Sequence, residues 1–276
     1  MESFRRAGLT FAVNDEGPRE GEAVVLLHGF PQDVHCWDRV APTLRNHGLR
    51  TLSPTQRGYS VAARPSRRRA YRTRETAADV VALLDAAELE RAHLVGHDWG
   101  AVPAWAMGAW HPNRVSSLTV LSTPHPGAMA MSFVSSLQGL RSLYMLLFNL
   151  PALPEVVAGR TLRRTLVRSG LPASDVERYC AAMEEPDALT GALNWYRGMP
   201  FSLRPPVGKI EVPTTYVWGR HDFALGRAAA DATRAWVRAP YRFVELDAGH
   251  WLPETRPDEV AAAIINSVET GRAPAS

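Results

Sequence analysis

The chain has 276 residues, of which 46% are hydrophobic and 21% charged, and its net charge is +3 at neutral pH. This balance is typical of a globular protein and excludes a disordered chain or a strongly basic nucleic-acid-binding protein. No apolar run reaches the roughly 18 residues of a membrane-spanning helix, and the N-terminus lacks the apolar core of a signal peptide, so we predict a cytoplasmic protein without membrane partners.

Short apolar runs recur along the first half of the chain, at residues 24–27, 94–95 and 118–121. Their continuous rather than alternating hydrophobicity predicts strands that are buried on both faces, as in a parallel sheet covered by helices. Between them, residues 76–87 carry apolar side chains at helical spacing. This alternation of strand and helix predicts right-handed crossovers and a mostly parallel, doubly wound α/β sheet.

The same alternation returns late in the chain. Strand-like and helical patterns follow one another at residues 214–218, 227–237, 241–246 and 257–268. Between the two halves, helical patterns are broken by prolines and no strand-like run occurs. We therefore predict one α/β core, formed by residues 1–125 and 206–276, and a helical cap, residues 126–205, inserted over the edge of the sheet.

A tight turn follows the predicted strand near residue 95. It has the sequence Gly96-His97-Asp98-Trp99-Gly100, which is the nucleophile-elbow pattern with aspartate in the place usually held by serine. Glycines suit a strained strand-to-helix turn that leaves no room for a Cβ. Such a turn presents its central side chain at the carboxyl edge of the sheet beside a helix N-terminus, so Asp98 is the predicted nucleophile. Taken alone, the pattern also fits an ordinary turn with a capping aspartate.

Other strand ends bring polar groups to the same edge. The backbone N–H of Phe30, after His28-Gly29, can join that of Trp99 to hold a developing oxyanion. His250 follows a late strand and is the predicted general base, with Asp222 as the acid that orients it. The chain order of nucleophile, acid and base is the one that this pattern requires. Packing or hydrogen-bonding roles are favoured for three neighbouring histidines, His97, His125 and His221.

Two further features of the sequence, an arginine cluster and two cysteines, do not predict a functional site. The densest arginine cluster is Arg64, Arg67, Arg68, Arg69, Arg72 and Arg74. Since it matches no nucleic-acid-binding module, a solvated loop is favoured over a binding patch, and we predict no nucleic-acid partner. Cys36 and Cys180 are far apart and in no metal-ligand spacing, so neither a disulfide framework nor a metal site is predicted.

Taken together, residues 28–31, 96–100, 220–222 and 249–251 resemble the epoxide hydrolases of the α/β-hydrolase fold, over nearly the whole chain. Two cap segments sharpen the resemblance, SLYMLLFNLP at residues 142–151 and LNWYR at residues 193–197. In that family, tyrosines in these contexts hydrogen-bond the epoxide oxygen. The resemblance therefore implies that Tyr144 and Tyr196 are an electrophilic pair, whereas packing under a lid is the alternative for both.

The resemblance implies hydrolysis of an epoxide to a vicinal diol. Asp98 would attack an epoxide carbon to form an ester while a cap tyrosine protonates the oxygen, and His250 with Asp222 would activate water to cleave the ester. No metal or organic cofactor is expected. The expected partner is a small apolar substrate, and both a monomer and a homodimer remain open. The expected pocket residues are Phe30, Trp99, Trp195 and His28, of which His28 is favoured as structural.

Two rival functions are weighed against this one. A haloalkane or haloacetate dehalogenase would use the same aspartate, but haloalkane dehalogenases often carry asparagine where Phe30 stands, and haloacetate dehalogenases usually carry arginine where Trp99 stands. A non-catalytic ligand binder with this fold has no physical reason to keep nucleophile, acid, base and both cap tyrosines. The comparisons with the two kinds of dehalogenase therefore favour an epoxide as the substrate.

Overall fold

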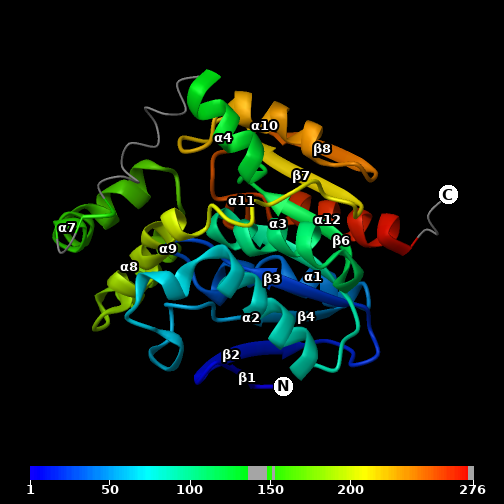
Figure 1. The fold of residues 1–276 in the computed structure, drawn as a ribbon, viewed down its shortest axis with the longest axis horizontal. Coiled ribbons are helices and arrows are strands. Elements are labelled where there is room, and N and C mark those ends of the chain that lie inside the picture. The colour runs from blue at the N-terminus through cyan, green and yellow to red at the C-terminus, as the bar shows by residue number, and fades with distance from the viewer. Residues whose placement is uncertain (136–147, 151–152, 273–276) are drawn as a thin grey trace.

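One sheet of eight strands forms the centre of the computed structural model, which describes residues 1–135, 148–150 and 153–272 (Figure 1). The strands are β1 (Ser3–Arg6), β2 (Leu9–Glu16), β3 (Ala23–Leu27), β4 (Arg50–Pro54), β5 (Ala92–His97), β6 (Val115–Leu121), β7 (Thr214–Gly219) and β8 (Tyr241–Leu246). Their order across the sheet is β1-β2-β4-β3-β5-β6-β7-β8. The β1–β2 and β2–β4 pairs are antiparallel, and the remaining pairs are parallel.

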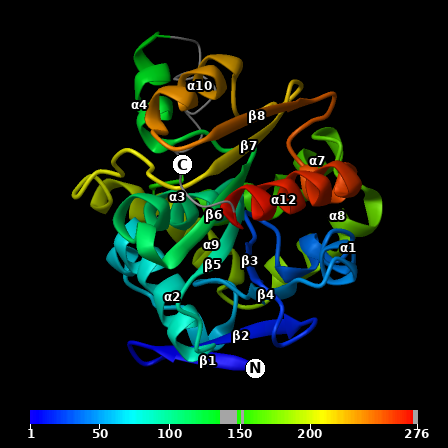
Figure 2. The ribbon, with the colours of Figure 1, turned by 90° about the vertical axis from the view of Figure 1, so that its right-hand side faces the viewer.

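Helices cover both faces of this sheet (Figure 2). The described helices of the chain are α1 (Ala41–Asn46), α2 (Thr73–Ala86), α3 (Ala101–Trp110), α4 (Pro126–Ser135), α7 (Leu153–Arg168), α8 (Ala173–Glu184), α9 (Ala188–Gly198), α10 (Arg227–Ala232), α11 (Leu252–Thr255) and α12 (Pro257–Arg272). Along β3, Val25 and Leu27 pack with α2 and α3, whereas Val24 and Leu26 pack with α1 and α12. The core therefore consists of two apolar layers separated by the sheet. None of the described helices is both long and apolar enough to cross a membrane.

The predicted α/β architecture, with its mostly parallel sheet, is confirmed, but three strands were not predicted. β1 and β2 form an antiparallel edge. β4 is buried along its whole length although its sequence, RTLSP, is mainly polar. Arg50 makes this burial possible because its guanidinium donates to both carboxylate oxygens of Asp15 on β2, at 2.8 and 2.7 Å. A strand whose polar side chains find partners on a neighbouring strand has no apolar run to reveal it.

The segment between β6 and β7 is helical where it is described. Helices α7, α8 and α9 pack on one another, whereas α4 packs on α10 and on the turn Thr233–Trp236, away from α7 (Figure 1). Gly127 makes the α4 contact possible, since a Cβ there would lie 2.2 Å from the ring of Trp236. We propose that α7–α9 form the cap and that α4 is a connection docked on the core.

The arginine cluster differs from the solvated loop that was favoured. The Arg64 guanidinium donates to the backbone oxygen of Pro186 at 2.6 Å, and Arg68 donates to that of Asn149 at 3.1 Å. Both acceptors belong to the segment inserted between β6 and β7. Part of the cluster therefore holds the inserted segment on the core.

Buried histidines make the fold sensitive to acid. Burial lowers the pKa of His93, His97 and His125 to about 4 each. His125 is held as a neutral ring, with Nε2 3.0 Å from the backbone oxygen of Gly208 and Nδ1 accepting from the N–H of Gly127 at 3.0 Å. The unfolded chain binds a proton at each histidine near pH 6.5. Stability is therefore lost as the pH falls from about 6.5 towards 4.

We expect His93, His97 and His125 together to contribute a fall of about 4 kcal/mol per pH unit in the free energy of unfolding in the middle of this range, because each takes up one proton on unfolding. The substitution His125→Gln should reduce the measured slope by about 1.4 kcal/mol per pH unit, the contribution of one proton, as measured by urea unfolding at a series of pH values. Above about pH 7.5 the two stability curves should run parallel. Equal slopes for both proteins below pH 6.5 would contradict this account of the acid sensitivity.

Candidate active site

Asp98 stands at a strained turn between β5 and α3. Its φ angle is 49°, in the left-handed region that residues other than glycine rarely adopt. The turn is also crowded, because a Cβ on Gly96 would lie 2.5 Å from the backbone oxygen of Gly100, and a Cβ on Gly100 would lie 2.1 Å from that of Leu27. The flanking glycines are therefore required by close backbone approach. The strain is confined to the residue whose side chain the turn presents.

The loop after β3 holds one oxygen of this carboxylate. The backbone N–H of Phe30 donates to Oδ1 of Asp98 at 2.8 Å. Gly29 lies directly against the same side chain, since a Cβ there would come within 2.4 Å of the Cβ of Asp98. A donor placed in this way can stabilise negative charge on the oxygen before and during a reaction.

His250 and Asp222 complete the group. Nδ1 of His250 lies 2.8 Å from Oδ2 of Asp222, and Nε2 of His250 lies 3.4 Å from Oδ2 of Asp98. The other oxygen of Asp222 accepts from the N–H groups of Ala224 and Leu225, at 2.8 and 3.0 Å. These bonds fix Asp222 on the loop after β7. The structure thus brings together three side chains that are widely separated along the chain.

Opposing effects set the charges in this group. Burial raises the pKa of Asp98, but the hydrogen bond and charge of His250 outweigh burial and bring the pKa below its ordinary value. Burial lowers the pKa of His250, but the two carboxylates of Asp222 and Asp98 outweigh it and hold the pKa well above its ordinary value. At neutral pH the resting site therefore holds an imidazolium between two carboxylates.

Aromatic rings surround the nucleophile on the cap side. The ring of Tyr196 in α9 meets Trp99 edge-on, with centroids 4.6 Å apart, and Phe30 at 5.7 Å. Phe148 adds a third ring, 4.9 Å from Tyr196. Tyr196 therefore lies against both residues whose N–H groups were predicted to form the oxyanion hole. Tyr144, the other predicted tyrosine, lies outside the described residues.

Two of the expected pocket residues, His28 and Trp195, are buried and bonded to backbone groups. His28 is fully buried, and its ring is held by backbone groups: Nδ1 lies 3.1 Å from the oxygen of Gly29, and Nε2 accepts from the N–H of Gln56 at 3.1 Å. Trp195 is 2% exposed, and its indole N–H donates to the backbone oxygen of Arg57 at 2.7 Å. Both side chains are thus held by backbone groups; this fits the structural role that was favoured for His28, and contact of either residue with substrate stays a prediction.

The neighbouring histidines have the packing and hydrogen-bonding roles that were favoured for them. His97 lies behind His250, with Nε2 2.9 Å from the backbone oxygen of His250. His221 is exposed and pairs with Asp247 at 2.9 Å. Within the described part of the chain, no group of His, Cys, Asp or Glu side chains could hold a metal ion.

Several contacts at the site were not predicted. Ser122, with a φ of 65°, donates through its hydroxyl to the backbone oxygen of His250 at 2.9 Å. Thr123 donates in the same way to the backbone oxygen of Asp98, also at 2.9 Å. The ring of Phe223 lies 5.4 Å from that of His250. In the sequence, the signal for these residues is their position. Ser122 and Thr123 directly follow β6, and Phe223 directly follows Asp222, so all three lie at the edge of the sheet where the site forms.

Comparison with known proteins agrees with this geometry. A model of the α/β-hydrolase fold family matches residues 22–257. An AB hydrolase superfamily protein of Bacillus subtilis is 32% identical over 95% of this chain and 93% of its own length. Epoxide hydrolase A of Mycobacterium tuberculosis is 32% identical over 94% of both chains. The crystal structure of epoxide hydrolase A from Mycobacterium thermoresistibile has a TM-score of 0.85 and 27% identity, and the match covers 97% of each chain.

Proposed function

Because this chain belongs to the epoxide hydrolases of the α/β-hydrolase superfamily, we propose that it hydrolyses an epoxide to a vicinal diol through a covalent ester on Asp98. The observation that carries this proposal is the placement of Asp98. Its carboxylate stands on a strained turn, with Oδ1 bonded to the N–H of Phe30 and Oδ2 3.4 Å from Nε2 of His250. The aromatic rings of Phe30, Trp99, Tyr196 and Phe148 favour a small apolar substrate.

Ring opening is the first step of the proposed reaction. An oxygen of Asp98 attacks an epoxide carbon, the ring C–O bond breaks, and the departing oxygen takes a proton from a tyrosine hydroxyl. Tyr196 is the described candidate for that acid, since its ring packs against Phe30 and Trp99. Tyr144 is the second candidate by resemblance. Solvent then restores the tyrosine proton.

Ester formation would also prepare the base for the second step. The charge of Asp98 disappears in the ester, so His250 loses one of the two carboxylates that raise its pKa. His250 can then give up its proton and act as a base beside Asp222. It deprotonates a water that attacks the ester carbonyl, while the N–H groups of Phe30 and Trp99 hold the oxyanion. The diol oxygen leaves with the proton from His250, the carboxyl group of Asp98 then passes its own proton to His250, and the resting carboxylate and imidazolium are restored.

The function is tested by product analysis on a panel of styrene-type, alkyl and fatty epoxides beside haloalkanes and haloacetates. We expect at least one epoxide to give a vicinal diol, and we expect the variant Asp98→Ala to give none. Release of halide from the halogenated compounds, with no diol from any epoxide, would overturn the proposal in favour of a dehalogenase.

A further inference from the structure

We propose that Trp195 and the core loop beneath it are positioning residues that set the direction of Tyr196 for ring opening. The proposal rests on the function proposed above, in which Tyr196 protonates the epoxide oxygen. We call the contact the α9 seat and define it by Arg57, Gly58 and Arg64 on the core and by Gly191 and Trp195 on α9. It explains why a buried tryptophan stands directly before the tyrosine.

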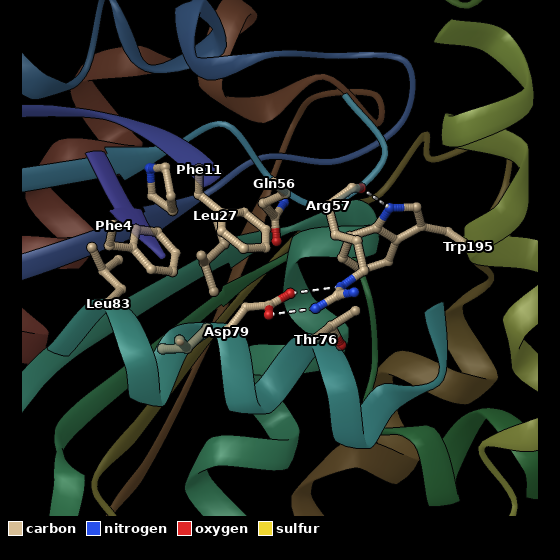
Figure 3. Close-up of a pocket in the computed structure, with 11 residues that line it drawn as sticks. Phe4, Phe11, Leu27, Gln56, Arg57, Thr76, Asp79, Leu83 and Trp195 are labelled. Atoms are coloured by element: carbon tan, nitrogen blue, oxygen red, sulfur yellow. Dashed lines mark hydrogen bonds and ion pairs between the residues drawn. The ribbon is translucent and has the colours of Figure 1, made fainter. Parts of the chain in front are cut away.

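Trp195 links α9 to the core through a hydrogen bond. Its indole N–H donates to the backbone oxygen of Arg57 at 2.7 Å (Figure 3). Its ring lies 6.0 Å from that of Trp99, and Trp99 in turn meets Tyr196 at 4.6 Å. Successive residues of a helix point about 100° apart around its axis, so fixing Trp195 fixes the direction in which Tyr196 leaves the helix.

Arg57 is itself held firmly. Its side chain is 3% exposed, and its guanidinium binds both carboxylate oxygens of Asp79 in α2, at 2.8 and 2.5 Å (Figure 3). The cavity beside this pair has a volume of about 20 Å³ and is lined by Phe4, Phe11 and Trp195 among others. Such a volume holds about one water molecule, so the ion pair does not face a substrate pocket. Its effect is to fix the carbonyl that Trp195 uses.

Two glycines bring the backbones of loop and helix into direct contact. A Cβ on Gly58 would lie 2.6 Å from the backbone oxygen of Gly191, and a Cβ on Gly191 would lie 2.2 Å from that of Gly58. Arg64 closes the contact by donating to the backbone oxygens of Gly58 at 3.0 Å and Pro186 at 2.6 Å. A side chain at either glycine would push α9, and Tyr196 with it, away from the core.

A misplaced acid affects only one of the two chemical steps. Tyr196 takes part in ring opening, whereas ester hydrolysis depends on His250, Asp222 and water. Loss of the Trp195 hydrogen bond should therefore slow formation of the ester and leave its hydrolysis unchanged. A displacement of about 1 Å in a catalytic group can cost up to roughly a hundredfold in rate.

The test is single-turnover rapid quench with mass spectrometry, which follows formation and decay of the ester on any epoxide that the enzyme turns over. For Trp195→Phe we expect ester formation to slow by roughly tenfold to a hundredfold. Ester decay should stay at the wild-type rate. The matched control is Trp110→Phe, which also loses one indole hydrogen bond to a backbone oxygen, that of Pro206 at 3.2 Å, and should leave both rates unchanged. Equal slowing of both steps in Trp195→Phe would overturn the proposal.

A double variant separates this proposal from the function on which it rests. In the Tyr196→Phe background, Trp195→Phe should slow ester formation no further, because there is no hydroxyl left to position. Full additivity of the two effects would overturn the positioning role. An unchanged rate in Tyr196→Phe alone would instead show that Tyr196 is not the acid. If Trp195→Phe fails to fold, Arg64→Met loosens the seat from the core side and should slow the same step to a smaller extent.

Discussion

Replacing His250 with alanine should leave an enzyme that forms its ester and then stops. The nucleophile and the two candidate acids, Tyr196 and Tyr144, remain, so the epoxide still opens, but no base is left to activate water. We expect steady-state turnover to fall roughly 10³-fold or more, and one epoxide mass to accumulate on the peptide that contains Asp98. Intact-protein and peptide mass spectrometry after incubation with a turned-over epoxide measures both effects.

The pH at which the His250→Ala variant should be assayed follows from the electrostatics of the site. His250 is the group that holds the pKa of Asp98 below its ordinary value against the effect of burial. Without it the carboxylate is harder to ionise, so the reaction should be run at about pH 8. His221→Ala is the matched control, since His221 is exposed and pairs with Asp247. It should keep wild-type turnover, whereas an unmodified Asp98 peptide in the His250 variant would count against a covalent ester.

Removing the hydroxyls of Tyr196 and Tyr144 together should abolish epoxide opening. General acids typically contribute about 10²- to 10⁴-fold to a rate, because an unprotonated alkoxide is a poor leaving group. The single variant Tyr196→Phe should retain part of the activity if Tyr144 shares the task. For Tyr144→Phe with Tyr196→Phe we expect no ester on Asp98 by mass spectrometry and no diol.

Tyr241→Phe provides the control for loss of a tyrosine hydroxyl, because Tyr241 lies on β8, at the edge of the sheet. Its turnover should equal that of the wild type. An unchanged rate of ester formation in the double variant would remove both tyrosines from the reaction. The aromatic contacts of Tyr196 with Phe30 and Trp99 would then have only a packing role.

The elbow and its partners could be predicted because each follows a predicted strand: β5 and β7 are buried along their whole length, whereas β8, which precedes His250, is only partly buried. The two glycines that flank Asp98 in the sequence predict a turn with no room for a side chain. The structure has such a turn, with close backbone contacts at Gly96 and Gly100. Asp222 and His250 follow consecutive strands, and carboxyl ends of neighbouring parallel strands meet at one edge. Strand order along the chain was therefore enough to bring these groups together.

Other features depend on tertiary contacts that no local pattern reveals. Trp195 and Tyr196 are adjacent on one helix, and only packing decides which of them faces the nucleophile and which faces the core. The polar strand β4 is buried because Arg50 finds Asp15 on β2. The arginine-rich loop is attached to the inserted segment because Arg64 and Arg68 meet backbone oxygens there. In each case the partner lies on another element.

A single turnover in water enriched in oxygen-18 tests the covalent step most directly. With enzyme in excess over epoxide, hydrolysis of the ester at its carbonyl carbon places solvent oxygen in the carboxylate of Asp98, and the diol receives an unlabelled oxygen from the enzyme. We therefore expect a mass increase of one label in the Asp98 peptide and none in the first-turnover diol. A labelled diol together with an unlabelled Asp98 peptide would show that water attacks the epoxide itself, and would contradict the account.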